Sequence, residues 1–206
     1  MEYSQKVLDY FMNPRNMGKI DDPDAVATEG SPACGDQVTI YLKVNPENQT
    51  IEDIKFQSYG CASNIATASI ITELAKGKTL EEGKKIDWED AASALDGLPP
   101  IKMHCSVLAV DTLRSAITNY EVTHKLAERP EFSKETIVEE LGRILYPKVG
   151  KSIIDLKMVK YVGWHDGVAT VDLDVPKFDE YRDNIAEEIR EHLGRYPEIK
   201  EINITI

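Results

Sequence analysis

Three cysteines, one aspartate and one histidine are the residues of this chain whose placement suggests chemistry. Cys34 precedes an alternating apolar run, and Cys61 and Cys105 each stand where a helical pattern begins, with Asp36 and His104 beside the first and last of them. Free backbone N–H groups at a helix start lower a thiol's pKa, and thiolate is the form that binds metal or attacks sulfur. The cysteines are too far apart for a CxxC zinc pair, so spacing alone leaves small buried cysteines as the other interpretation.

The composition is that of an ordinary globular protein. The 206 residues, 42% hydrophobic and 29% charged, are enough for one large or two small cores without disulfides. The formal net charge of -12 argues against nucleic acid or an anionic membrane as a partner and favours basic proteins. The sequence shows neither a membrane-spanning apolar run nor a secretory signal pattern, so we expect a cytoplasmic location and reduced thiols.

Apolar periodicity predicts the elements that must position these side chains. Helical spacing predicts helices over 3–12, 63–76, 87–95 and from about residue 105 to 120. Alternation at 38–44 and 51–56, on either side of the turn-forming stretch "NPENQT", predicts a hairpin whose register breaks near Asp53. Cys61 and Cys105 therefore belong to helix starts, and Asp36 to the start of a strand.

A break in the pattern at "LAERPEFS" predicts a domain boundary, with one domain over 1–126 and a second over 133–206. The second domain is predicted to contain a helix (134–145), two strands (153–162 and 167–175) around a turn at "HDG", a helix (179–194) and a last strand (199–206). The predicted fold class is α+β. An antiparallel sheet with helices packed on it is followed by a small α/β domain of order α-β-β-α-β.

Six sequence blocks make the first domain resemble the IscU scaffold proteins of iron-sulfur cluster assembly, the family that also supplies the amino-terminal domain of NifU. They are "YSQKVLDYFMNPRNMG" at 3–18, "ACGD" at 33–36, "YGCASNIATAS" at 59–69, "GKTLEE" at 77–82, "LPPIK" at 98–102 and "MHCSVLA" at 103–109. All six stand in the family's order. The resemblance implies an IscU/NifU-N-like fold for residues 1–126.

The resemblance also implies a non-enzymatic scaffold. Such a protein accepts sulfur as persulfide from an IscS-like cysteine desulfurase, binds Fe²⁺, builds a 2Fe-2S cluster and transfers it to apo-proteins; pairing two chains as a homodimer would extend this to 4Fe-4S. The implied cluster and metal ligands are Cys34, Cys61 and Cys105, with Asp36 or His104 completing the set, and Cys105 is the implied persulfide acceptor. A carboxylate or imidazole binds such iron more weakly than thiolate, which suits a cluster made for release.

The segment "LPPIK", the neighbours His104 and Cys105, and the likeness to a zinc-binding family each allow a second interpretation. The segment "LPPIK" matches the one that family members present to an Hsp70-type chaperone, although it also serves as a plain loop; its residues are Leu98, Pro99, Pro100, Ile101 and Lys102. Neighbouring helical residues point about 100° apart, so we do not expect a His104–Cys105 hydrogen bond. The related SufU proteins bind Zn²⁺ and accept sulfur, but they carry an insertion between the second and third cysteines and lack the histidine, so the resemblance is to IscU. A zinc-bound, SufU-like sulfur acceptor for a cysteine desulfurase is the alternative function, in which Cys34, Asp36, Cys61 and Cys105 hold Zn²⁺; Zn²⁺ is also the metal expected in the cluster-free form.

The segment 137–176 of the second domain resembles the small domain of SufT and of Mrp/ApbC-type cluster carriers. That family's Asp-Pro-Glu is replaced here by Tyr146-Pro147-Lys148, and its cysteine is missing around Val175, Pro176 and Lys177. A thiol or cluster role is therefore not expected. Docking, dimer contact or target recognition are the predicted roles, with simple stabilisation as the alternative.

Overall fold

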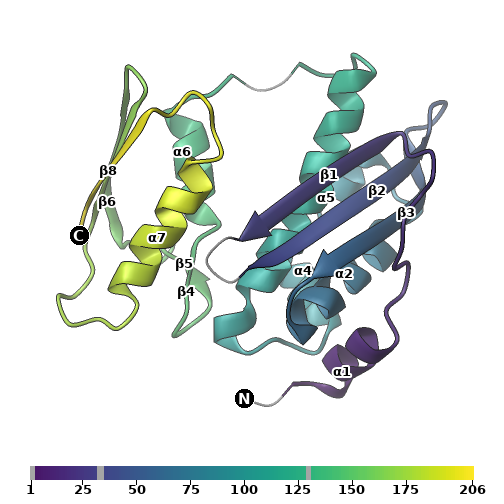
Figure 1. Cartoon of the computed structure of the whole chain (residues 1–206), viewed down its shortest axis with the longest axis horizontal. Coiled ribbons are helices and arrows are strands. Elements are labelled where there is room, and N and C mark those ends of the chain that lie inside the picture. The colour runs from purple at the N-terminus through teal and green to yellow at the C-terminus, as the bar shows by residue number, and fades with distance from the viewer. Residues whose placement is uncertain (1–2, 32–34, 129–130) are drawn as a thin grey trace. The chain divides into compact units, whose positions relative to one another are not determined.

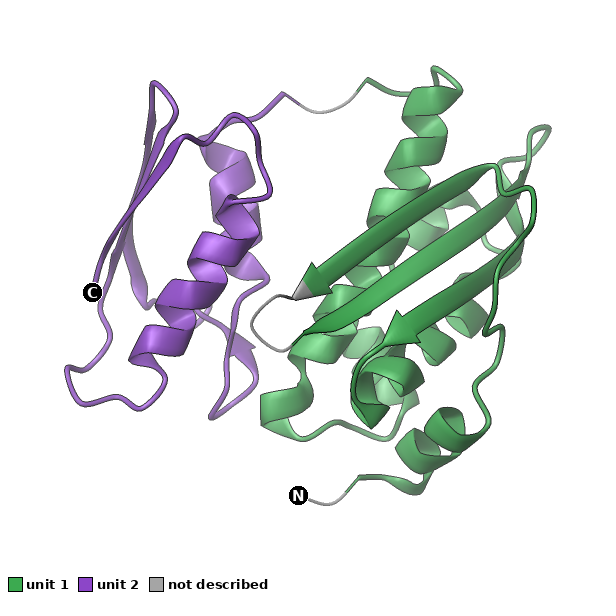
Figure 2. Cartoon of the chain, viewed as in Figure 1, with its two compact units in different colours: residues 1–129 green, residues 130–206 purple. Residues whose placement is uncertain are grey.

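The computed structural model describes residues 3–31, 35–128 and 131–206 and has the predicted α+β class. The chain divides into two compact units, Met1–Arg129 (unit 1) and Pro130–Ile206 (unit 2), which Figure 2 shows in green and purple. Each unit has its own cluster of buried apolar side chains, and no described residue belongs to both clusters.

An antiparallel sheet in the order β1-β2-β3 forms the centre of unit 1 (Figure 1). Its strands are β1 (Ala25–Ser31), β2 (Asp36–Asn45) and β3 (Thr50–Tyr59). Alternate residues of β2, from Val38 to Val44, are buried, as the apolar pattern predicts. The register between β2 and β3 shifts between Lys43 and Val44, opposite Asp53, which confirms the predicted break.

Helices cover one face of this sheet. The helices of unit 1 are α1 (Gln5–Met12), α2 (Ala62–Ala75), α3 (Leu80–Lys84), α4 (Trp88–Ala94), the 3₁₀ turn η1 (Pro100–Lys102) and α5 (His104–Thr123). In Figure 1, α2, α4 and α5 lie behind the sheet; α5 packs against β1 and β2, and α2 packs against β3. The four predicted helices of this domain are confirmed.

The sequence patterns do not predict β1 or α3. The buried face of β1 carries only alanines, Ala25 and Ala27, so its alternation is weak. Helix α3 is five residues long, although its capping box, in which Thr79 and Glu82 exchange hydrogen bonds, is visible in the string "TLEE".

Helix α2 is buried on nearly every side. It packs against α1, α5 and β3, and its polar side chains are small enough to be enclosed. The buried polar residues of α2 are Ser63, Asn64, Thr67, Ser69 and Thr72. Four of them hydrogen-bond to residues outside the helix and so tie it to its neighbours: Asn64 to Ser58, Thr67 to Cys105, Ser69 to Arg15 and Thr72 to Asn16.

Unit 2 places two helices and a three-stranded sheet around the second core. Its elements are α6 (Lys134–Gly142), β4 (Leu145–Tyr146), β5 (Lys151–Ser152), β6 (Val159–His165), β7 (Val168–Leu173), α7 (Arg182–Leu193) and β8 (Glu201–Thr205). β6 and β7 form an antiparallel hairpin at Asp166 and Gly167, both with positive φ, as "HDG" predicts. β8 pairs parallel to β7 after the α7 crossover.

Four boundaries predicted for unit 2 are wrong by three residues or more; β6 ends at His165 and not at residue 162, and α7 begins at Arg182 and not at residue 179. The other two concern the start of β6 and the end of α6. The strand expected over 153–162 begins only at Val159, because residues 153–157 form turns and Ile153 is buried in the core of unit 2. The helix expected over 134–145 ends at Gly142. The residues beyond it, Leu145 and Tyr146, pair with β5 instead. A short apolar run does not distinguish strand from buried turn, which explains the errors at the start of β6 and the end of α6.

Within the described residues, no helix is both long and apolar enough to cross a bilayer.

Candidate functional site

Four of the five chemically interesting residues lie together where three elements of unit 1 begin. Asp36 is the first residue of β2, Cys61 is the N-cap of α2, and His104 and Cys105 open α5. Gly35, directly before Asp36, has a φ of 72°, a conformation that favours glycine. Cys34, the remaining predicted ligand, lies outside the described residues.

The side chains of these four residues converge on the Cys105 sulfur. Cys105 Sγ lies 3.8 Å from Cys61 Sγ, 3.5 Å from His104 Nε2 and 4.0 Å from Asp36 Oδ2. One ligand atom from each of Asp36, His104 and Cys105 lies within 4.8 Å of the other two. Thiolate, imidazole and carboxylate at this spacing form a donor set suited to iron or zinc.

The contact between His104 and Cys105 contradicts the sequence-based expectation that neighbours in a helix point apart. The 100° separation applies to the Cα–Cβ directions of consecutive residues. The imidazole ring, however, carries Nε2 well beyond its own Cβ, and His104 is the first residue of α5. Its ring therefore reaches the Cys105 sulfur.

The pKa values of the two thiols of the site are shifted in opposite directions. The hydrogen bond from the Cys105 thiol, together with the Asn64 backbone N–H and the Lys102 charge, lowers the pKa of Cys61 to about 6 against the opposing effect of burial. The same hydrogen bond, together with burial and the negative charge of Cys61, raises the pKa of Cys105. At neutral pH the pair therefore holds one thiolate, on Cys61, and one proton, on Cys105.

The pKa values of Lys102 and His104, which lie beside the thiols, are also shifted. Burial opposes the charge of Lys102, but the thiols Cys61 and Cys105 outweigh it and raise the pKa of Lys102, so it stays protonated. Burial, followed by the charge of Lys102, lowers the pKa of His104, so its ring is neutral at pH 7. A neutral imidazole can bind a metal ion, whereas an imidazolium cannot.

Thr67 also supports this site, and no sequence pattern indicates that it does. The buried Thr67 Oγ1 lies 3.1 Å from the carbonyl oxygen of Cys105, 2.9 Å from that of Ser63 and 3.1 Å from that of Asn64. Thr67 thus joins the middle of α2 to the first turn of α5. Its position one helical turn after Asn64 gives no hint of this contact with α5.

The predicted partner segment leads into the thiol site. Ile101 is 41% exposed, and Leu98 and Lys102 are partly buried. Pro100–Lys102 form the 3₁₀ turn η1 immediately before α5. The segment therefore offers an exposed apolar side chain one residue before the cation that faces the thiols.

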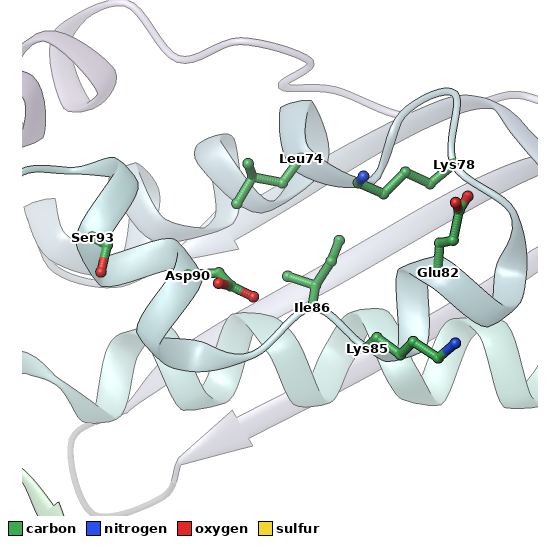
Figure 3. A pocket seen from close by; sticks show the side chains of 7 residues that line it. All are labelled: Leu74, Lys78, Glu82, Lys85, Ile86, Asp90 and Ser93. Atoms are coloured by element: carbon green, nitrogen blue, oxygen red, sulfur yellow. The ribbon is translucent and has the colours of Figure 1, made fainter.

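A separate pocket of about 470 Å³ opens on unit 1 (Figure 3). Its lining residues are Leu74, Lys78, Glu82, Lys85, Ile86, Asp90 and Ser93. In Figure 3 the side chains of Leu74 and Ile86 approach from opposite sides. The carboxylates of Glu82 and Asp90 accept hydrogen bonds in the capping boxes of α3 and α4, so they serve helix ends. Among the predicted site residues that the structure describes, none lines this pocket.

Comparison with known proteins places unit 1 in a family. Residues 2–127 match the family model described as the NifU-like N terminal domain. The Archaeoglobus fulgidus protein named iron-sulfur cluster assembly scaffold protein IscU 1 is 60% identical over 118 residues, which are 57% of this chain and 76% of that protein. The Azotobacter vinelandii protein named iron-sulfur cluster assembly scaffold protein IscU is 50% identical over 124 residues, 59% of this chain and 95% of that protein.

A solved structure is also similar. It is described as a putative iron-sulfur cluster assembly scaffold protein for the SUF system from Fervidobacterium islandicum, and it aligns with a TM-score of 0.47 and 26% identity over 56% of this chain and 96% of that chain. The fold and the site of unit 1 are those of an α+β domain that gathers thiolates, a carboxylate and an imidazole at one point. The chain belongs to the NifU-like N-terminal domain family, with IscU scaffold homologues. The family match ends at residue 127, before unit 2.

Proposed function

We propose that this chain is a scaffold for iron-sulfur cluster assembly, which accepts sulfur from a cysteine desulfurase, binds iron, builds a 2Fe-2S cluster and passes it to apo-proteins. The observation that carries the proposal is the convergence of Asp36, Cys61, His104 and Cys105 within a domain whose relatives are named as such scaffolds. The proposed ligands are Cys34, Cys61 and Cys105 with Asp36, and His104 is the competing fourth ligand. The cluster is the cargo of this site.

The proposed sulfur step is a thiol–persulfide exchange at Cys105. The Cys105 thiolate attacks the outer sulfur of the desulfurase persulfide, the sulfur–sulfur bond of the donor breaks, and the desulfurase cysteine leaves as thiolate. The proton that Cys105 must first lose has three acceptors near it: the Cys61 thiolate at 3.8 Å, Asp36 at 4.0 Å and, in the tautomer that carries its proton on Nδ1, His104 Nε2 at 3.5 Å. Because Cys105 is fully buried, residues around it must move before a donor reaches it.

Conversion of this persulfide into cluster sulfide requires two electrons for each sulfur. A thiol or an electron-transfer protein must supply them, while the remaining ligands hold iron beside the persulfide. Soft thiolates bind the iron of such clusters firmly, and the carboxylate of Asp36 binds it less firmly. This mixed set suits a site from which the cluster leaves.

The proposed partners follow from the surface. The net charge of -12 favours a basic desulfurase surface. The exposed Ile101 and the residues around it in 98–102 are proposed to dock a chaperone of the Hsp70 type. The role that we propose for unit 2, which lacks cysteine, is recognition of a partner or of a second copy of the chain.

Anaerobic reconstitution tests the proposal. The full chain is incubated with Fe²⁺, cysteine and a cysteine desulfurase, and the visible absorption, iron and sulfide are measured. We expect cluster absorption in the wild type and its loss in Cys61→Ser, since a hydroxyl is a poor ligand for this iron. A reaction without desulfurase is the control.

Two outcomes of this experiment would contradict the proposal. Zinc retained by the protein with no cluster absorption would instead indicate a zinc-bound sulfur acceptor. A Cys61→Ser variant with the wild-type spectrum would remove Cys61 from the ligand set.

A further inference from the structure

The carboxylate of Asp36 occupies space that only a glycine at position 60 leaves open. A Cβ placed on Gly60 would lie 2.6 Å from Asp36 Oδ1 and 2.7 Å from Asp36 Cγ. Carbon and oxygen atoms that are not bonded to each other do not approach so closely without repulsion. Gly60 does not have a positive φ, so the backbone itself does not require glycine here. Position 60 therefore needs glycine because a side chain there would clash with Asp36.

The other side of this space is closed by Asn64. The same Cβ would lie 2.7 Å from Asn64 Nδ2, which donates a hydrogen bond to Ser58 Oγ at 3.0 Å. Asn64 is fully buried in the first turn of α2. A methyl group at position 60 would therefore displace the carboxylate of Asp36, whose Oδ2 lies 4.0 Å from Cys105 Sγ.

We propose that Gly60 is a positioning residue, which with Asn64 seats the carboxylate of Asp36 beside Cys105 and so fixes Asp36 as the oxygen ligand of the site. The inference rests on the proposed metal-binding function of these residues. It separates Asp36 from His104, because the three atoms nearest to a Cβ on Gly60 belong to Asp36 and Asn64 and none to His104. It also explains why the residue before Cys61 must be small although its backbone conformation is open to any residue type.

A double-mutant cycle in the full chain tests the proposal with Co²⁺ as the probe, since the absorption of bound Co²⁺ reports its ligands. The variants are Gly60→Ala, Asp36→Ala and the two combined. We expect each single variant to weaken Co²⁺ binding roughly 10- to 100-fold with the same change of spectrum. We expect the combined variant to be no weaker than Asp36→Ala alone, because the shorter side chain no longer meets the new methyl group.

The matched control is Gly142→Ala, because a Cβ on Gly142 meets no atom within 4 Å and its φ is not positive. It should bind Co²⁺ like the wild type. Wild-type binding by Gly60→Ala, or a combined variant whose losses multiply, would overturn the proposal. If Gly60→Ala does not fold, the combined variant decides: recovery of folding identifies the clash with Asp36, and continued misfolding assigns the clash to Asn64 and overturns the proposal.

The cycle is independent of cluster chemistry. A chain that shows the expected Co²⁺ coupling but builds no cluster with a desulfurase would retain Gly60 as the seat of a metal ligand and refute the scaffold function. A chain that builds a cluster but shows no coupling in Co²⁺ binding would retain the scaffold function and refute the positioning role of Gly60.

Discussion

At the scale of single residues, the site depends on a proton shared unequally by two sulfurs. Cys61 Sγ and Cys105 Sγ are 3.8 Å apart, and the hydrogen bond between them lowers the pKa of one thiol and raises that of the other. The partly exposed Cys61 is therefore the reactive thiolate of the metal-free protein, and the buried Cys105 is protected. Metal binding must then remove the proton that Cys105 retains.

This arrangement predicts the pH dependence of thiol alkylation. In the metal-free chain, the rate of Cys61 alkylation by iodoacetamide should rise with a midpoint near pH 6, because only thiolate reacts and the pKa of Cys61 is about 6. Mass spectrometry of the digested protein assigns the label to each cysteine. Cys105 should stay unlabelled at this pH.

Two variants at position 105 provide the control. Cys105→Ala removes the hydrogen bond that stabilises the Cys61 thiolate, so the midpoint should move upward, whereas Cys105→Ser keeps a donor and should shift less. A midpoint that is the same in all three proteins would show that the second sulfur has no influence on the first.

At the scale of elements, contacts between α2 and α5 must hold together the N-terminal ends of these helices, which carry Cys61 and Cys105. Thr67 provides this link, because its hydroxyl lies between carbonyl oxygens of its own helix α2 and the Cys105 carbonyl oxygen of α5. A buried polar group that loses its hydrogen-bond partner lowers the free energy of unfolding by about 1–3 kcal/mol. The distance between the two sulfurs is thus partly a property of α2–α5 packing.

The Thr67→Val variant tests this link while keeping the shape of the side chain. We expect the free energy of unfolding to fall by about 1–2 kcal/mol in a denaturant titration. We also expect a changed midpoint of Cys61 alkylation, since the first turn of α5 is released from α2. Thr112→Val is the matched control, because the hydroxyl of the buried Thr112 donates a hydrogen bond to the Leu108 carbonyl oxygen within α5.

The control should show a loss of stability without any effect on the alkylation midpoint. If Thr67→Val leaves the thiol titration unchanged, the two helix starts are positioned by apolar packing alone.

At the scale of the whole molecule, the two units have separate cores and different kinds of polar anchor. In unit 2 the buried Glu140 of α6 accepts a hydrogen bond from Tyr196 at 2.7 Å and lies 3.0 Å from His192 Nδ1 of α7. Burial opposes its charge, but His192, Arg143 and Tyr196 outweigh burial and lower the pKa of Glu140. Removing one partner of such a buried network costs about 3–5 kcal/mol.

The Glu140→Ala variant should therefore destabilise unit 2 alone. Hydrogen exchange should accelerate in α6 and α7 and stay unchanged in α2 and α5, and the Cys61 alkylation midpoint should remain near pH 6. Because the folded pKa of Glu140 lies below its usual value of 4.5, the ionised group stabilises unit 2 above that pH. This stabilisation is lost as the pH falls through the folded pKa.

Glu187→Gln is the control, because Glu187 is an exposed carboxylate on α7, the helix that carries His192. Its effect on stability should stay within about 0.5 kcal/mol. Faster exchange in α2 and α5 of the Glu140→Ala variant would show that the units do not unfold independently.

The sequence alone determined the elements with strong periodicity and the residue types that stand where they begin. Alternation in β2 and helical spacing in α2 and α5 are short-range signals, and they placed Cys61 and Cys105 at helix starts before any fold was known. The missed strand β1 and the misplaced strand start at residues 153–158 lie where small or buried residues obscure the apolar period.

Only the tertiary structure decided which groups touch. Asp36 and Cys105 are 69 positions apart and meet because β2, α2 and α5 pack at one point. The His104 ring reaches its neighbour's sulfur, Thr67 bonds to another helix, and Gly60 leaves room for a carboxylate from a distant strand. Periodicity and propensity describe interactions within a few residues along the chain, whereas these contacts depend on distances that packing of the whole unit sets.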